Sequence, residues 1–170
     1  MSERQWYDLR PVDAGFTDAA PARYTIETDI ALPRQAVWDA FVDAATWRHW
    51  WPGVSAALYE GGHPYGVGTV RRSVVNGEDF QATMLVWSEP KPGNTARWGY
   101  RIDRSTLALA SAQLEVTEFE EAGVGTRVRW ILAVDPLQDF DRFAQGQAFE
   151  EFLRESLQQA LKRLQGYFVG

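Results

Sequence analysis

The chain has 170 residues, 45% of them hydrophobic and 14% aromatic, and its formal charge is −6. This apolar content is enough for one folded core and excludes a chain that is disordered over most of its length. The negative charge opposes extended contact with phosphates, and the lack of cysteine excludes disulfides, thiolate catalysis and cysteine metal sites. We therefore expect one folded domain that does not bind nucleic acid.

The segment before the first regular pattern comprises residues 1–22. It contains Pro11, Gly15 and Pro21 among scattered charges and shows no sustained hydrophobic period. Its charges stand where a signal peptide has its apolar region, and no later window reaches the roughly 18 consecutive apolar residues of a membrane span. These features predict an N-terminal arm before a domain of residues 23–170, in a cytoplasmic protein without a membrane span.

A strand and two short helices are predicted at the start of the domain. Polar and apolar residues alternate from Tyr24 to Leu32, which is typical of a half-buried strand. Pro33 ends the strand and favours the first turn of a helix, and the apolar spacing that follows predicts a short amphipathic helix over 33–43. A second short helix is expected over 46–51.

The pair Asn76-Gly77 lies between two segments rich in β-forming residues, which is the strongest short signal for a hairpin with a two-residue type I′ turn. Such a turn fixes the register of the two strands. It predicts three pairs on one side of the sheet: Val75 with Glu78, Ser73 with Phe80, and Arg71 with Ala82.

The rest of the chain predicts an antiparallel meander followed by a long helix. Strands are expected over 95–103, 108–119 and 126–135, with turn residues between them. After Pro136 the apolar residues recur with a helical period, which predicts an amphipathic helix from about 139 or 146 to 168. This order of elements indicates an α+β fold.

The order of elements and four short motifs resemble a known family over residues 23–168. The motifs are Val37-Trp38, Trp50-Trp51-Pro52, Gly66-Val67-Gly68-Thr69-Val70-Arg71-Arg72 and Gly125-Thr126-Arg127-Val128. The chain resembles the polyketide cyclase/dehydrase and lipid-transport family of the START-like (SRPBCC) superfamily. The resemblance implies a helix-grip fold, in which a curved antiparallel sheet of about six or seven strands wraps around the long C-terminal helix and encloses an apolar cavity.

The resemblance and the alternation of side chains along the strands together imply which residues line the cavity. The expected ligand-binding set is Arg71, Ser73, Phe80, Met84, Trp98, Tyr100, Trp130, Phe149, Phe152 and Ser156. From the strand over 108–119, the expected inward residues are Ala110, Ala112, Leu114 and Val116. Many relatives carry a glutamate at the position that matches Ala82, so acid–base roles of that glutamate do not transfer to this chain.

Alternative interpretations stand beside the cavity. The aromatic side chains are equally consistent with a packed core. Arg71 is either an anchor for a ligand carboxylate, phenolate or carbonyl, or it forms a salt bridge to an inward acid or lies at an open rim. The glycine-rich stretch 61–68 lacks the Lys-Ser/Thr ending of a phosphate loop and is expected to be a mobile loop beside the cavity, with Tyr65 at its tip.

The histidines argue against a metal or hydrolytic site. The chain has two, His49 and His63, and neither belongs to a metal-binding motif or to a nucleophile-elbow pattern. We expect no metal and no cofactor, and the catalytic residues, if the protein is an enzyme, are not identified.

The expected function is binding or carriage of a hydrophobic small molecule, aromatic, polyketide-like or lipid-like, in the internal cavity. One alternative is an enzyme of the polyketide cyclase or dehydratase type that acts on a ligand in the same cavity. A second alternative is a chaperone cofactor that binds a partner protein through the exposed side of the sheet. The sequence does not identify the ligand or the oligomeric state.

Overall fold

The computed structural model of the protein describes residues 3–137 and 147–169. Its first half contains β1 (Tyr7–Asp8), α1 (Phe16–Ala19), β2 (Ala22–Ile30), α2 (Arg34–Val42), a 3₁₀ turn (Ala44–Thr46), α3 (Trp47–Trp50) and β3 (Val54–Tyr59). The second half contains β4 (Val70–Val75), β5 (Glu78–Ser88), β6 (Ala96–Ser105), β7 (Ala110–Ala122), β8 (Gly125–Pro136) and α5 (Gln147–Val169).

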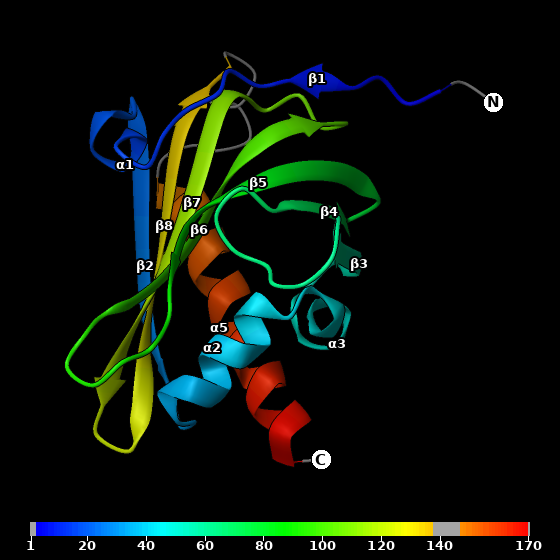
Figure 1. The fold of residues 1–170 in the computed structure, drawn as a ribbon. Helices are drawn as coiled ribbons and strands as arrows, with labels where there is room; N and C mark the ends of the chain where they lie inside the picture. The colour runs from blue at the N-terminus through cyan, green and yellow to red at the C-terminus, as the bar shows by residue number, and fades with distance from the viewer. Residues whose placement is uncertain (1–2, 138–146, 170) are drawn as a thin grey trace.

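The strands form one antiparallel sheet in the order β2-β8-β7-β6-β5-β4-β3, and the short β1 pairs with β6. The sheet curves around α5, and α2 and α3 lie at one end of the same concave side (Figure 1). This arrangement confirms the expected α+β helix-grip fold, with its two short helices after the first long strand. β3 is an additional strand, since the sequence analysis assigned no element to residues 54–59.

The predicted Asn76-Gly77 turn and its register are confirmed. Asn76 and Gly77 have φ angles of 51° and 78°, the left-handed values that a type I′ turn requires at both central positions. The three predicted pairs are present in the β4–β5 ladder. Because side chains alternate between the two faces of a strand, this register places Arg71 and Ser73 on the concave face.

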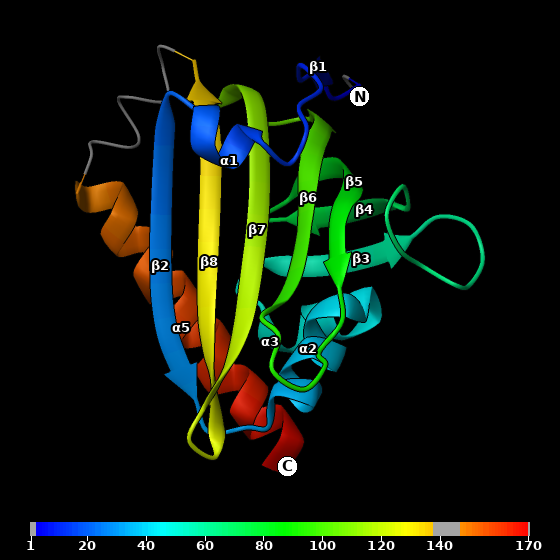
Figure 2. The ribbon, with the colours of Figure 1, turned by 60° about the vertical axis from the view of Figure 1, so that its left-hand side comes forward.

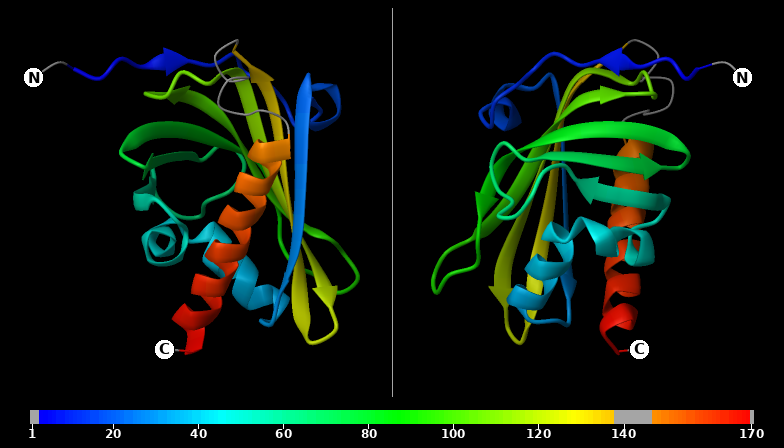
Figure 3. Two further views of the ribbon diagram at one scale, coloured as in Figure 1. Left: turned by 180° about the vertical axis from the view of Figure 1, so that it is seen from behind. Right: turned by 45° about the vertical axis from the view of Figure 1, so that its right-hand side comes forward.

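The helix α5 runs along the concave side of the sheet (Figure 3). It packs there through a narrow apolar stripe. The fully or almost fully buried residues of this stripe are Leu153, Leu157, Ala160, Leu161 and Leu164. Phe152 and Phe168 follow the same helical period in the sequence, but they are 58% and 47% exposed. The earlier of the two expected starts of this helix lies in residues 138–146, outside the described residues.

A buried arginine connects α2 to the sheet through hydrogen bonds. The guanidinium of Arg34 donates hydrogen bonds to three main-chain carbonyl oxygens, those of Lys91, Asn94 and Phe119. It thereby connects α2 to the β5–β6 loop and to β7, so the helix is held by polar contacts as well as by its apolar face. In the described part of the chain, no helix has the length and apolar character needed to cross a membrane.

The N-terminal segment packs on the convex face of the sheet. Val12 and Phe16 are buried there against Leu114, Val116 and Ile131, in an apolar cluster separate from the main core. Figure 2 shows α1 and α5 on opposite faces of β7 and β8. These strands are therefore covered by protein on both faces, which matters for the side chains that they present to the interior.

A candidate ligand cavity beneath the C-terminal helix

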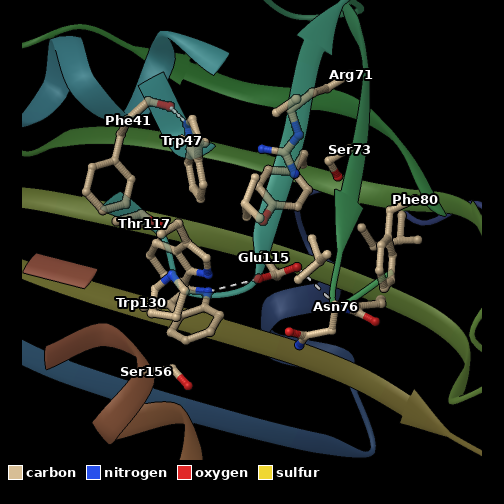
Figure 4. A pocket seen from close by; sticks show the side chains of 18 of the residues that line it. Phe41, Trp47, Arg71, Ser73, Asn76, Phe80, Glu115, Thr117, Trp130 and Ser156 are labelled. Carbon is tan, nitrogen blue, oxygen red and sulfur yellow. Dashed lines mark hydrogen bonds between the residues drawn. The ribbon is translucent and has the colours of Figure 1, made fainter. Parts of the chain in front are cut away.

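A cavity of about 210 Å³ lies between the concave face of the sheet and the helices α3 and α5. Figure 4 shows side chains from several strands converging on it. Its aromatic wall consists of Phe41, Trp47, Trp51, Phe80, Trp98, Tyr100, Trp130 and Phe152. Its polar wall consists of Arg71, Ser73, Asn76, Gln113, Glu115, Thr117 and Ser156, besides the Tyr100 hydroxyl. The aromatic side chains therefore surround a void and do not fill the interior, which decides against the solid-core interpretation.

Arg71 lies in a cage of aromatic rings on the cavity wall. It is only 6% exposed. Its guanidinium carbon lies 4.0 Å from the ring centroid of Tyr100, and 5.4 Å and 5.5 Å from those of Trp47 and Trp98. Contact with ring faces stabilises the buried charge. It does not satisfy the N–H groups, and Nε and Nη1 have no hydrogen-bond partner among the residues that the structure describes.

Two interpretations of Arg71 are thereby removed. A residue that is 6% exposed does not lie at an open rim. Within residues 3–137 and 147–169, Arg71 also forms no ion pair with a carboxylate. What remains is a buried cation with two nitrogens, Nε and Nη1, without a hydrogen-bond partner, which costs free energy in the absence of an acceptor.

Glu115 faces the same cavity from β7. Its Oε1 accepts a hydrogen bond from Trp130 Nε1 at 3.0 Å, and its Oε2 accepts one from Gln113 Nε2 at 3.1 Å. Burial raises the pKa of Glu115 above its ordinary value, and the positive charge of Arg71 and the hydrogen bonds oppose this increase. The interior thus contains one acid and one base that do not contact each other directly.

Two buried tyrosines accompany these charges. Burial raises the pKa of Tyr59 to about 12, and Arg71 opposes the increase. Burial also raises the pKa of Tyr100, with a further contribution from the negative charge of Glu115, while Arg71 lowers it. Both phenols are therefore neutral at physiological pH and serve as hydrogen-bonding groups, not as charges.

The tryptophans of α3 have a structural role as well as a place on the wall. Trp47 Nε1 donates to the main-chain oxygen of Phe41 at 2.9 Å, and Trp50 Nε1 donates to Thr46 Oγ1 at 3.0 Å. These bonds fix the rings, and Trp50 is fully buried and does not reach the cavity. The cavity wall at α3 is therefore rigid.

The wall formed by α5 is looser. Phe152 lines the cavity and yet is 58% exposed, so it stands where the cavity meets solvent. Ser156 also lines the cavity, but its hydroxyl already donates to the main-chain oxygen of Phe152 at 2.8 Å. The mouth of the cavity therefore lies beside the first turns of α5.

Eight of the ten residues that the sequence analysis selected lie on the cavity wall: Arg71, Ser73, Phe80, Trp98, Tyr100, Trp130, Phe152 and Ser156. Met84 and Phe149 do not. Met84 is fully buried behind the wall. Phe149 packs edge-on against Tyr24, with 4.9 Å between the ring centroids. Whether the eight bind a ligand stays a prediction.

The assignment of inward residues on β7 was wrong. Ala112, Leu114 and Val116 belong to the convex cluster, whereas Ala110 lies in the main core because the pairing shifts between Ala110 and Ala112. The inward residues that sequence reasoning missed are Gln113, Glu115 and Thr117. Ala112, Leu114 and Val116 face outward, where the N-terminal segment covers them.

A signal for these residues was present in the β7–β8 turn. Ala122 pairs with Gly125, so the loop between the strands is the two residues Gly123 and Val124. That turn sets Thr117 opposite Trp130, which was correctly expected to point inward. Since directly opposite residues point to the same face of the sheet, Thr117 faces inward like Trp130. Glu115 lies two residues before Thr117 on the same strand, so it faces inward as well.

The glycine-rich stretch does not reach the cavity. Its Tyr65 packs against Tyr59 and His63, at ring-centroid distances of 4.7 Å and 4.2 Å. These three residues line a different and more open depression of about 610 Å³, together with Trp87. Tyr65 therefore lines this depression and not the cavity beneath α5.

Comparison with known proteins places the chain in a family. The family model described as polyketide cyclase / dehydrase and lipid transport matches residues 21–169. An uncharacterised protein of Mycobacterium tuberculosis is 23% identical over 132 residues, which is 75% of this chain and 74% of that protein. An uncharacterised protein of Mycobacterium bovis matches to the same extent.

Solved structures share the fold at low sequence identity. A START superfamily protein from Mycobacterium smegmatis has a TM-score of 0.64 and 14% identity, over 85% of this chain and 95% of that one. The structure of Ara h 8.0201 has a TM-score of 0.61 and 15% identity, over 87% and 97% of the two chains. Together with the family match, the START-like fold supports a domain that binds hydrophobic ligands. The chain belongs to the polyketide cyclase/dehydrase and lipid-transport family.

Proposed function

We propose that this domain binds a hydrophobic small molecule that carries an anionic or strongly polar oxygen. The observation that carries the proposal is the pair of buried Arg71 nitrogens without partners, placed on the wall of an aromatic cavity. Ligand sites are mostly apolar and contain a few well-placed polar groups, and this cavity has that composition. An oxygen acceptor on the ligand would complete the hydrogen bonding of Arg71.

The size of the cavity limits the part of the ligand that lies inside it. An apolar cavity of about 150 Å³ in another protein accommodates benzene. A cavity of about 210 Å³ therefore holds one ring with substituents or two fused rings. A longer ligand would extend past Phe152, where the cavity opens.

Two fluorescent probes with the same aromatic skeleton test the proposal. N-phenyl-1-naphthylamine is neutral, and 8-anilinonaphthalene-1-sulfonate adds a permanent negative charge. We expect both to bind the folded protein at one site. Arg71→Met should weaken binding of the sulfonate at least about tenfold, because it removes a buried partner of the anion, and should change binding of the neutral probe much less.

The matched control is Arg72→Met on the same strand. Arg72 points to the opposite face and pairs with Glu60 at the surface, so its removal should leave both affinities unchanged. If neither probe binds while the near-ultraviolet circular dichroism shows native packing, the proposed function is wrong. If Arg71→Met weakens both probes equally, the cavity is confirmed as a binding site but Arg71 is not its anchor.

A second candidate function is an enzyme of the cyclase or dehydratase type, and Glu115 is the specific observation that favours it. A buried carboxylate with a raised pKa is suited to accept a proton at neutral pH. In this candidate Glu115 would take the proton from a carbon beside a carbonyl group, and Arg71 would stabilise the negative charge that develops on the carbonyl oxygen.

The test begins with native mass spectrometry of protein purified from its own host, to identify a bound compound. Incubation with a precursor of that compound then shows whether the protein changes the products. If it does, Glu115→Gln should abolish the change while the compound still binds. If the wild-type protein leaves the products unchanged, the enzyme candidate is wrong and the binding function remains.

A further inference from the structure

We propose that binding of an anion at Arg71 is coupled to protonation of Glu115, so that Glu115 determines which acids the cavity accepts. This inference rests on the proposed function, because it concerns the same cavity. It goes beyond that function by assigning a role to a second residue of the cavity wall and by naming the ligand class as singly charged weak acids.

The cavity wall carries one cation and one carboxyl group before any ligand enters. Of the lining residues in the described part of the chain, Arg71 is the cation and Glu115 is the carboxyl group. Both are buried, at 6% and 9% exposed. Arg71 comes from β4 and Glu115 from β7, and Tyr100 on β6 pairs with Glu115. Where Glu115 is ionised, each charge lowers the cost of burying the other.

An incoming anion changes the charge of the cavity. In the pH range where Glu115 is ionised in the unliganded protein, an anion that pairs with Arg71 gives the cavity two negative charges and one positive charge, and the guanidinium no longer favours the charged form of Glu115. Like charges in a desolvated site strongly disfavour double ionisation. Taking up one proton at Glu115 restores neutrality.

Within residues 3–137 and 147–169, the groups that face Glu115 are Arg71 from β4, Tyr100 from β6, Gln113 from its own strand and Trp130 from β8, and Arg71 is the one cation among them. α5 contributes the uncharged Phe152 and Ser156 to the cavity. Burial keeps Tyr100 neutral. The proton balance of the site therefore depends on Arg71, Glu115 and the ligand.

The hydrogen bonds of Glu115 suit both of its protonation states. Trp130 Nε1 donates to Oε1, which still accepts when the proton is on Oε2. Gln113 donates to Oε2 through its amide nitrogen, and a turn of the carboxamide would present its oxygen to a protonated Oε2. Both oxygens of Glu115 thus keep a hydrogen-bond partner after protonation.

A weak acid supplies the required proton itself. A carboxylic acid or phenol enters as a neutral molecule, its O–H bond breaks, and the proton forms a new O–H bond on Glu115. The resulting ligand anion pairs with Arg71, and the net charge of the cavity does not change. Acids with two negative charges, such as phosphate monoesters, exceed what one arginine and one proton neutralise, so the site should exclude them.

Calorimetry with the two probes tests the coupling. The sulfonate stays charged, so any proton must come from the buffer, and its binding enthalpy is measured in phosphate and in Tris at the same pH. The difference between the buffers should correspond to uptake of up to about one proton. The neutral probe should show none.

The affinity for the sulfonate should also depend on pH. It should rise as pH falls, by up to about tenfold per pH unit, within the range where Glu115 is charged in the unliganded protein and neutral in the complex. Glu115→Gln should remove both the proton uptake and the pH dependence. If that variant does not fold, the binding enthalpies of the wild-type protein in the two buffers still show whether a proton is taken up.

The possible results distinguish failure of the proton coupling from failure of the proposed ligand binding. Binding of the sulfonate with no proton uptake and with constant affinity from about pH 5 to pH 9 would overturn the coupling and leave the proposed function intact. Failure of both probes to bind would instead overturn the proposed function. An uptake that persists in Glu115→Gln would assign the proton to another group and would also refute the inference.

Discussion

The helix α5 offers a test in which a smaller residue should matter more for stability than a larger one. Leu157 is fully buried in the main core, whereas Phe152 is 58% exposed at the mouth of the cavity. Leu157→Ala removes the equivalent of about three methylene groups, each contributing roughly 0.8 kcal/mol when buried. The void that remains adds to this, so we expect a loss of about 3 kcal/mol in the free energy of unfolding.

The same arithmetic gives a smaller loss for Phe152→Ala. A fully buried phenylalanine contributes about 1.5–3 kcal/mol, and less than half of this side chain is covered, so we expect a loss of about 1 kcal/mol. Urea unfolding followed by far-ultraviolet circular dichroism measures both variants, and the dependence on urea should stay unchanged. Equal losses would mean that Phe152 packs as a core residue and that the cavity has no mouth at this position.

Two further predictions concern buried polar groups. Arg34→Met should lower the free energy of unfolding, measured in urea, by about 2–4 kcal/mol, because three main-chain carbonyls lose their donor. The control Arg154→Met breaks an exposed ion pair with Glu150 and should cost under about 0.5 kcal/mol. The raised pKa of Tyr59, about 12, means that folding favours its protonated form, so its contribution to stability is complete below about pH 10 and is lost as pH rises towards 12. Absorbance near 295 nm should show that Tyr59→Phe removes one late-titrating tyrosine, and an unchanged late phase would contradict this.

Most of the fold was predictable because local signals agree with the tertiary structure. Asn76-Gly77 fixes the β4–β5 register whatever surrounds it, since few residues tolerate the backbone angles of a type I′ turn. The stripe from Leu153 to Leu164 has a helical period that permits burial on one face only. β3 gave no comparable signal, because it lies at the edge of the sheet and three of its six residues are exposed.

The candidate site was harder to predict because the usual relation between polarity and direction is reversed on β7. Leu114 and Val116 are apolar, which normally marks the inner face, but Val12 and Phe16 cover them on the convex side. The polar Glu115 faces inward, where a cavity and not a packed core lies. Alternation in the sequence identifies two faces of a strand, and it does not say which face is inside when both are covered.

The two buried charges are themselves an argument that the cavity has an occupant. Apolar residues of similar volume usually stabilise an interior at least as well as a buried ion pair does. Here Arg71 and Glu115 do not even form a direct pair, and Arg71 leaves two nitrogens unused, so stability alone gives no reason for this arrangement. The aromatic cage and the donors from Trp130 and Gln113 hold the two charged side chains in place. A charge held in position, desolvated and without its partner is suited to bind a complementary group, and the cavity that both side chains line is where that group fits.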